Sequence, residues 1–317
     1  MNVTREPITI FENHDSMIAD RNFDQFCWFV NLMADNGFAV RAGIFKSRDY
    51  EVDSLRVRTF GVIVEFRDIG LSHHEAAAVA QSIVNDAKSM AAEKMTRTSD
   101  GYVCRKISDY LLPPDDEILK EELRRLKATK NLDMEAADTT SVTWPAQISQ
   151  VCKRRGVLPS QIAVPSDVAQ SPWCNALPLR EQRGLHVHLT CDPSITNIDT
   201  SQSIPQMTMM SGSSIGTIIP SARIILRAPF VKCTRPMLGQ EKLAVAGIPK
   251  EVSSAFREEV EFDFSSDVLF SDLAGNAFQA EILGAFFLAV MKNLLPKHIA
   301  FLQRSATLEL KCFKIVH

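Results

Sequence analysis

The pattern of hydrophobic and polar residues predicts strand, helix and strand in the first seventy residues. Residues 7–11 form a short β-branched run that ends at Glu12. Residues 22–38 place apolar side chains on one face at helical spacing: Phe23, Phe26, Cys27, Val30 and Met33. The stretches 38–45 and 59–66 have the composition of two further strands. This order predicts a βαβ-like unit within a larger sheet, because three strands are too few to cover their own faces.

After residue 71 the pattern becomes helical and then irregular. Residues 72–95 are rich in alanine, and residues 113–130 begin with prolines and acids and end with basic residues, so both are predicted helices. The region 131–220 is rich in Ser, Thr, Pro and Gln and is predicted to form loops with short strands. Regular patterning then returns. We expect three parts, 1–70, 71–226 and 227–317.

A strongly apolar stretch near the C-terminus, SDLAGNAFQAEILGAFFLAV (271–290), raises the question of a membrane anchor. Its unbroken apolar run covers 282–291 and stops at Lys292. A helix that spans a bilayer needs about 20 apolar residues, so this run is too short. The first residues carry charges where a signal peptide needs an apolar core. We therefore expect a soluble protein.

Composition and charge narrow the classes of function. Of the 317 residues, 45% are hydrophobic and 23% are charged, which is typical of a folded globular protein. The formal net charge is −3, so any contact with DNA must come from a local basic patch. The seven cysteines are scattered and include no Cys-x-x-Cys pair, which favours a reducing compartment, nuclear or otherwise intracellular.

Two local patterns contain candidate site residues, each with a plainer structural alternative. Glu12 ends a predicted strand, where open α/β sheets hold ligand and catalytic groups, although a simple strand end with a turn at Asn13 also explains it. Arg56 and Arg58 alternate at the start of a strand, so both point to one side. They could hold a phosphate or a base carbonyl by paired hydrogen bonds, or lie at a solvated sheet edge.

A third pattern is a basic segment, 221–250, with six Lys or Arg against the single Glu241. It suits phosphate contacts, with Arg227, Lys232 and Arg235 as the candidates, and a charged surface helix is the alternative. A fourth pattern is "HVHLTC", which contains His186, His188 and Cys191. The residue types suit zinc, but the spacing matches no standard ligand set, so we expect alternating histidines on a strand and no metal.

The order of these motifs along the chain resembles the C-terminal half of the DNA cytosine-5 methyltransferases. The family's Glu-Asn-Val is matched by Glu12 and Asn13, with His14 in place of Val. Its Asp-Tyr-Gly-Val-Pro-Gln-x-Arg-x-Arg aligns without a gap with DYEVDSLRVR (49–58). Its Arg-x-Leu-Thr-x-x-Glu and Gly-Phe-Pro are similar to RPMLGQE (235–241) and GIP, and its Gly-Asn-Ala-(Val/Phe) to GNAF (275–278). The resemblance covers about Pro7 to Met291.

The resemblance implies an α/β fold, with a partial Rossmann-like methyltransferase sheet and an irregular α+β target-recognition region. Residues 1–70 would be the central part of the catalytic domain, 71–226 the recognition-like region, and 227–317 a return to the catalytic domain. The Gly-Asn turn would open a core helix and line the S-adenosylmethionine pocket, with Gly275 allowing close approach and Asn276 holding the turn.

The resemblance also implies roles in methyl transfer to cytosine C5 in double-stranded DNA. Glu12 would contact N3 of the base, and Arg58, together with Arg56, would hold the flipped base and its phosphates. The family's nucleophile lies in a Pro-Cys motif, and no Pro-Cys dipeptide occurs in the sequence. The glycine-rich cofactor motif is absent as well. We therefore expect a truncated, catalytically incomplete homologue that needs a missing N-terminal half or partner subunit, or alternatively a non-catalytic DNA-binding or regulatory subunit.

Overall fold

The protein is described by a computed structural model in which the chain forms two compact units. Unit 1 comprises Met1–Glu51, Arg56–Val103 and Phe278–His317, and unit 2 comprises Val52–Leu55 and Cys104–Ala277. The structure describes residues 8–50, 56–67, 69–96, 106–136, 144–220, 222–249, 251–252, 267–277 and 279–294. The tail ATLELKCFKIVH (306–317), whose pattern is that of a strand, lies outside these residues.

The sheet of unit 1 contains the three strands that the sequence predicts. These are β1 (Ile8–His14), β2 (Phe38–Lys46) and β3 (Val57–Glu65), in the order β1-β3-β2 with both pairings antiparallel. Helix α1 (Phe23–Asp35) links β1 to β2, as expected from the βαβ-like pattern, but β3 lies between these two strands. The mixed α/β class is confirmed, and every hydrogen-bonded pair of described strands is antiparallel.

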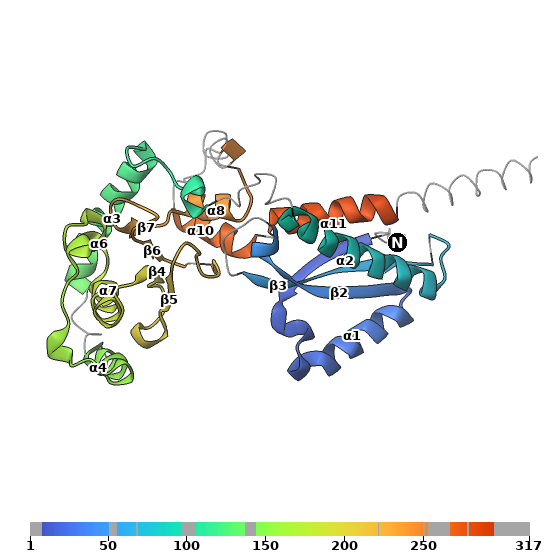
Figure 1. Cartoon of the computed structure of the whole chain (residues 1–317), viewed down its shortest axis with the longest axis horizontal. Helices are drawn as coiled ribbons and strands as arrows, with labels where there is room; N and C mark the ends of the chain where they lie inside the picture. The colour runs from blue at the N-terminus through green and yellow to red at the C-terminus, as the bar shows by residue number, and fades with distance from the viewer. Residues whose placement is uncertain are drawn as a thin grey trace, which may run out of the picture. The chain divides into compact units, whose positions relative to one another are not determined.

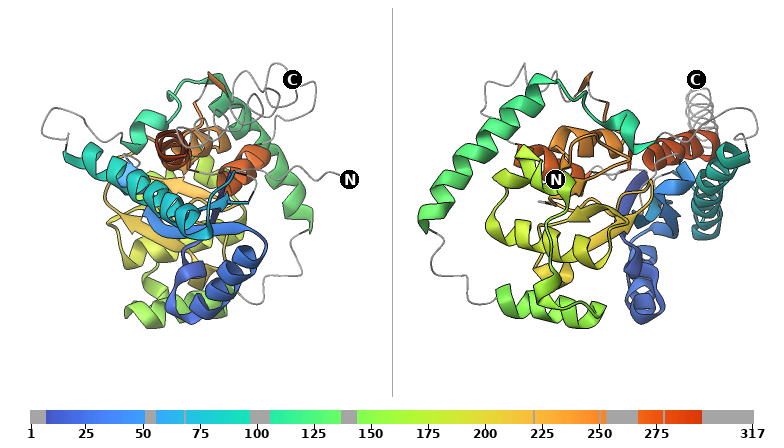
Figure 2. Two further views of the ribbon diagram at one scale, coloured as in Figure 1. Left: turned by 90° about the vertical axis from the view of Figure 1, so that its right-hand side faces the viewer. Right: turned by 60° about the vertical axis from the view of Figure 1, so that its left-hand side comes forward.

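Two helices cover one face of this sheet, and α1 lies on the other face (Figures 1 and 2). Alternate residues of β3, namely Phe60, Val62 and Val64, are fully buried against α2 (His73–Thr96) and α11 (Ala280–Asn293). The small side chains of α2 allow close packing, and α11 contributes Phe286 to the same core. The apolar run 282–291 is therefore a core helix of unit 1.

Unit 2 combines a four-stranded antiparallel sheet with a helical region. The sheet has the order β5-β4-β6-β7 and consists of β4 (Ile195–Asp199), β5 (Thr208–Ser211), β6 (Ile224–Leu226) and β7 (Arg235–Pro236). The helices are α3 (Glu117–Ala136), α4 (Trp144–Arg155), α5 (Ser166–Ala169), α6 (Pro172–Ala176), α7 (Leu179–Cys191), α8 (Gly239–Val245) and α10 (Asp267–Asn276). Short 3-10 turns in the two units are η1 (Asp15–Ile18), η2 (Asp20–Asn22), η3 (Ser47–Tyr50), η5 (Ile107–Tyr110), η7 (Pro159–Gln161) and η8 (Ile204–Gln206).

The expected part boundaries differ from those of the two units. Residues 71–103 belong with the sheet of unit 1, because the alanine-rich α2 packs on that sheet. Residues 227–277 belong to unit 2, so the return to unit 1 occurs only near Gln279. Periodicity locates a helix along the chain, but tertiary contacts decide on which unit its apolar face packs.

The expected strand at "HVHLTC" is wrong, because these residues end α7. His188 is buried, and its Nε2 lies 2.7 Å from the carbonyl oxygen of Ile204. Burial lowers the pKa of His188. On a helix, residues two apart do not share a face. Within the described part of the chain, no cluster of His, Cys, Asp and Glu could hold a metal ion.

None of the described helices is, by itself, long and apolar enough to cross a membrane. The helices α10 and α11 meet the requirements of length and composition only when they are taken together across a bend.

Candidate functional site

Unit 1 brings together the three residues that the sequence marks as candidate catalytic groups. The Glu12 Oε1 lies 3.1 Å from Nη2 of Arg56 and 3.3 Å from Nε of Arg58. The side chains of Glu12, Arg56 and Arg58 are 9%, 6% and 17% exposed. Glu12 and Arg56 are far apart in sequence, so the fold assembles this cluster.

The register of the sheet explains why these side chains meet. Glu12 of β1 pairs with Phe60 of β3, and His14 pairs with Arg58. Because side chains alternate across a strand, Glu12 and Arg58 lie diagonally opposite each other on the same face. Arg56 is two residues before Arg58 and just precedes β3, so it lies on the same side.

The segment η3, which follows β2, is anchored close to the cluster. The backbone N–H of Ser47 donates to the Arg56 carbonyl at 3.0 Å, and the Ser47 hydroxyl donates to the same oxygen at 3.1 Å. Tyr50 donates through its hydroxyl to the Ala87 carbonyl of α2 at 2.8 Å. Burial, with a smaller effect of Asp49, raises the pKa of Tyr50, so the phenol remains a donor. These contacts fix the backbone of Arg56.

One acceptor and one donor of the cluster have no partner among the described residues. The carboxylate oxygen Oε2 of Glu12 accepts no hydrogen bond, whereas Oε1 faces both guanidinium groups. The Arg58 Nε faces Glu12 and its Nη1 donates to the Val57 carbonyl, whereas Nη2 forms no hydrogen bond or ion pair with a described residue. Burial and the neighbouring Arg56 lower the pKa of Arg58. The cluster therefore offers a polar ligand one acceptor, Glu12 Oε2, and one donor, Arg58 Nη2.

The expected cofactor residues Gly275 and Asn276 lie in unit 2, and their geometry corrects the expectation that they open a helix. Gly275 and Asn276 end α10, whereas α11 begins at Ala280, so the pair closes one helix and does not open the next. A Cβ on Gly275 would lie 2.1 Å from the Pro220 nitrogen and 2.5 Å from the Ile219 carbonyl carbon. The close approach that requires glycine is therefore to the protein's own backbone.

The basic segment of unit 2 is largely neutralised by carboxylates, some within the segment and some from elsewhere in the chain. Arg227 forms a bidentate ion pair with Asp167, with Nε at 2.7 Å and Nη2 at 3.1 Å. Arg235 is 5% exposed and pairs with Glu241 at 2.7 and 2.8 Å. The local excess of positive charge is therefore not an exposed basic patch, and a phosphate contact by either arginine would require breaking an ion pair.

Two further cations of this segment also have internal partners. Arg223 pairs with Glu181 at 2.5 Å. Lys242 is 2% exposed and donates to the Ala222 carbonyl at 2.5 Å and to the Ser271 hydroxyl at 2.6 Å. Sequence reasoning missed Glu181 and Asp167 because they lie 42 and 60 residues from the arginines with which they pair.

Lys232 is the one candidate DNA contact that remains available in the described part of the segment. It is exposed and forms no ion pair with another described residue. It lines a cavity of about 440 Å³ together with Trp173, Phe230 and Arg235. An exposed ammonium beside such a cavity is accessible to a phosphate group.

Comparisons with known proteins add little to this geometry. No protein-family model and no curated protein matches the sequence. Among solved structures, the Dnmt2 methyltransferase of S. pombe is similar with a TM-score of 0.42 and 11% identity, over 91% of this chain and 67% of that chain. This likeness is too weak to establish a common fold.

Proposed function

We propose that the chain takes part in S-adenosylmethionine-dependent methylation of cytosine C5 in double-stranded DNA, and that Glu12 and Arg58 hold the target base. The observation that supports this proposal is the acceptor and donor left open at Glu12 Oε2 and Arg58 Nη2 in a nearly buried cluster. The order of motifs in the sequence supports it independently.

The two open atoms complement the pairing edge of cytosine. Cytosine carries an amino donor at N4 and a carbonyl acceptor at O2, so Glu12 accepts from N4 while Arg58 donates to O2. Thymine carries a carbonyl in place of the amino group and would face the carboxylate with a second acceptor. This edge is occupied by guanine in a duplex, so the base must be flipped out before it can reach the cluster.

The described residues supply neither the cofactor pocket nor the nucleophile of the proposed reaction. S-adenosylmethionine provides the methyl group in this chemistry, but the space at Gly275 is filled by the backbone of Ile219 and Pro220. Cys27, the described cysteine of unit 1, lies on α1, on the opposite face of the sheet from Glu12. In this proposal the chain holds the base, and a partner provides the thiolate and the methyl donor.

A non-catalytic DNA-binding or regulatory role is the second candidate. It is favoured by the lack of a Pro-Cys dipeptide in the sequence. Burial raises the pKa of the Cys174 thiol to about 11, which makes it a poor thiolate nucleophile. A base-holding subunit and a regulatory subunit both bind DNA, so discrimination between bases is the property that separates them.

The first test measures recognition of an extruded base. Duplexes with a cytosine or a thymine opposite an abasic site are titrated with the protein, because such a base flips at little cost. The wild type is expected to prefer cytosine by about 1–3 kcal/mol, the value of one good base contact. Glu12→Gln should remove most of this preference, because the amide is a weaker acceptor and can also present a donor.

The control variant is Glu117→Gln, which changes an exposed carboxylate of α3 that pairs with Lys120. It should keep the wild-type preference. Equal binding of cytosine and thymine by the wild type would exclude the base-holding role. A catalytic contribution is then tested by tritium transfer from labelled S-adenosylmethionine to DNA. No transfer is expected with this chain alone, and Glu12-dependent transfer is expected when a cofactor-binding half with a Pro-Cys motif is supplied.

The second test concerns the phosphate contacts of unit 2. Lys232→Ala is expected to reduce the slope of log K against log salt by about 0.9, the value of one phosphate contact in B-DNA. Lys127→Ala, which removes another exposed lysine of unit 2, serves as the control and should leave the slope unchanged. Arg235→Ala should instead lower the melting temperature, because it leaves Glu241 buried without its partner. An unchanged slope for Lys232→Ala would place the DNA surface elsewhere.

A further inference from the structure

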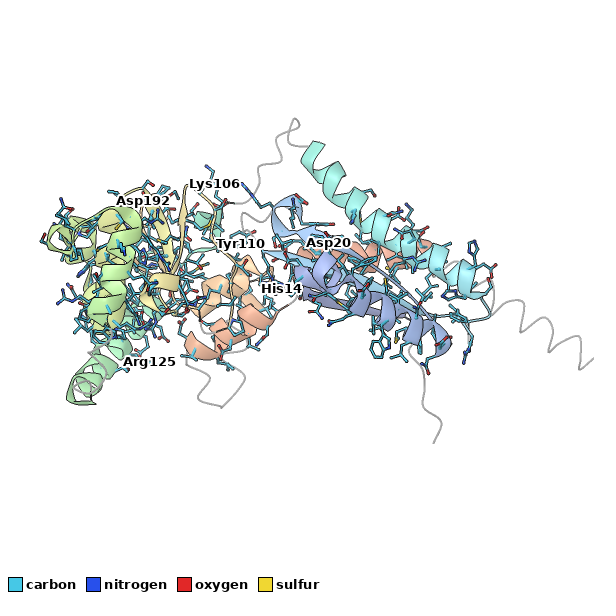
Figure 3. The ribbon with its side chains drawn as sticks, turned by 90° about the horizontal axis from the view of Figure 1, so that it is seen from below. His14, Asp20, Lys106, Tyr110, Arg125 and Asp192 are labelled. Atoms are coloured by element: carbon cyan, nitrogen blue, oxygen red, sulfur yellow. The ribbon has the colours of Figure 1, made fainter. Side chains whose placement is uncertain are left out.

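A groove of about 680 Å³ lies in unit 1 between the end of β1 and helix α1. The turns η1 and η2, which follow β1, form part of its wall, and His14 and Asp20 of this segment are labelled in Figure 3. Aromatic and amide side chains dominate the lining: Asn13, Ser16, Met17, Asn22, Asp24, Gln25, Phe26, Trp28 and Phe29.

The groove is separate from the Glu12 cluster. Successive side chains of a strand point to opposite faces of the sheet, so Asn13 points away from the face that carries Glu12. Phe11, two residues before Asn13, contacts Phe29 of α1 with ring centroids 6.5 Å apart in an edge-to-face arrangement. The groove therefore lies on the α1 face, and the base-holding role proposed above does not use it.

The aromatic side of the groove offers rings for stacking. Trp28 is 67% exposed, which is unusual for the largest apolar side chain. Phe26 and Phe29 also line the groove, and their ring centroids lie 6.5 Å apart. Although α1 is rich in apolar residues, none of its residues is buried. These rings are thus available to a planar ligand and are backed by the contact between Phe29 and Phe11.

On the polar side of the groove, two asparagine amides each use one of their polar atoms in a hydrogen bond to the backbone. Asn13 accepts the backbone N–H of His14 through Oδ1 at 2.7 Å, which leaves its amino group open to the groove. Asn22 donates through Nδ2 to the Ser16 carbonyl at 2.8 Å, which leaves its Oδ1 without a partner among the described residues. A fixed donor and a fixed acceptor beside aromatic rings suit the edge of a heterocyclic base.

We propose that this groove binds an amino-substituted heteroaromatic base, adenine or cytosine, either in a free nucleoside or as an unpaired base of a nucleic acid strand. The ring of Trp28 stacks on the base, and the amides of Asn13 and Asn22 bond its edge. Asp24 accepts a hydrogen bond from the exocyclic amino group. Asp24 is the only charged group among the described residues that line the groove, so a terminal phosphate in the groove is repelled.

The ligand is identified by quenching of the tryptophan fluorescence of the full chain, to which Trp28, Trp144 and Trp173 contribute. Adenosine and cytidine are expected to quench it, uridine to quench it less because it lacks the amino group, and AMP less than adenosine because of its phosphate. Single-stranded oligo(dA) separates the two sources of the base. Quenching by oligo(dA) at lower concentration than by adenosine indicates a strand, and the reverse order indicates a free nucleoside; either order supports the site.

Variants of the groove test the assignment. Trp28→Ala and Asn13→Ala are each expected to weaken binding by roughly 5- to 150-fold; for Trp28→Ala this is the size of one base–aromatic stack. Binding of every variant is measured by equilibrium dialysis with labelled adenosine, because Trp28→Ala removes the fluorophore of the groove. Asp24→Asn should reduce the preference for adenosine over AMP. Leu32→Ala is the matched control, because Leu32 is 42% exposed on the same helix and does not line the groove. It should leave binding unchanged, and circular dichroism should show the same helix content in all variants.

Three results would overturn the proposal. One is the absence of quenching by adenosine and cytidine at millimolar concentration. Another is equal quenching by uridine, which would show stacking without recognition of the amino group. The third is self-association that Trp28→Ala abolishes, which would make this face of α1 an interface between copies of the chain.

Discussion

Glu241→Ala is expected to destabilise unit 2 by about 3–5 kcal/mol, the cost of removing one partner of a buried ion pair. Glu241 is 0% exposed, and its two oxygens accept four hydrogen bonds. Arg235 donates two of them, and the backbone N–H groups of Leu112 and Leu238 donate the others at 2.7 and 2.8 Å. The alanine variant leaves a buried guanidinium and two backbone donors unsatisfied. Chemical denaturation followed by tryptophan fluorescence measures the loss, because Trp144 and Trp173 lie in this unit.

Two further variants test whether charge or shape causes this loss. Glu241→Gln keeps the shape but loses one acceptor and the negative charge, so an intermediate loss is expected. Glu117→Ala removes a carboxylate whose side chain is 79% exposed, and it should leave the denaturation midpoint unchanged. A wild-type midpoint for Glu241→Ala would show that Arg235 finds water or another partner.

Phe286→Ala is expected to destabilise unit 1 by about 3–5 kcal/mol, as for other buried phenylalanines that are truncated to alanine. Phe286 is 0% exposed, and its ring lies 5.1 Å from that of Phe45 and 5.8 Å from that of Phe60, centroid to centroid. The substitution opens a cavity between α11 and the sheet. Thermal unfolding followed by circular dichroism measures the effect.

The neighbouring Phe287 is the matched control, because it has the same chemistry on the same helix but is 56% exposed. Phe287→Ala should leave the melting temperature nearly unchanged. Equal losses for the two variants would mean that both faces of α11 are covered in solution, which contradicts the packing of this helix on the sheet through one face.

The two buried carboxylate–arginine clusters differ in how completely their atoms are satisfied. In unit 2 both oxygens of Glu241 are used by the protein itself, which is the pattern of a structural ion pair. In unit 1 Glu12 leaves Oε2 open, and Arg58 leaves Nη2 open. Neither atom is one of the buried polar atoms that lack a hydrogen-bond partner, so a ligand that bonds them would replace water. This difference is the reason for placing the site in unit 1.

The sequence by itself determined the local elements. Period-two and period-3.6 patterns located β1, α1, β2, β3 and α2 because these periods reflect which side chains face the core. The apolar run 282–291 was recognised as too short for a membrane anchor, and the structure uses it as a core helix. The motif order also selected Glu12, Arg56 and Arg58, which the structure brings into one cluster.

Only the tertiary structure decided which elements pack together and which charges are free. Local patterns do not encode that β3 lies between β1 and β2, because strand order depends on long-range pairing. The basic segment resembled a phosphate-binding surface until Asp167, Glu181 and Glu241 were found beside its arginines. At Gly275 the sequence indicated a close backbone approach, but it could not show that the approaching group is the protein's own backbone at Pro220. Contacts between distant residues cannot be inferred from spacing, because chain folding sets their partners.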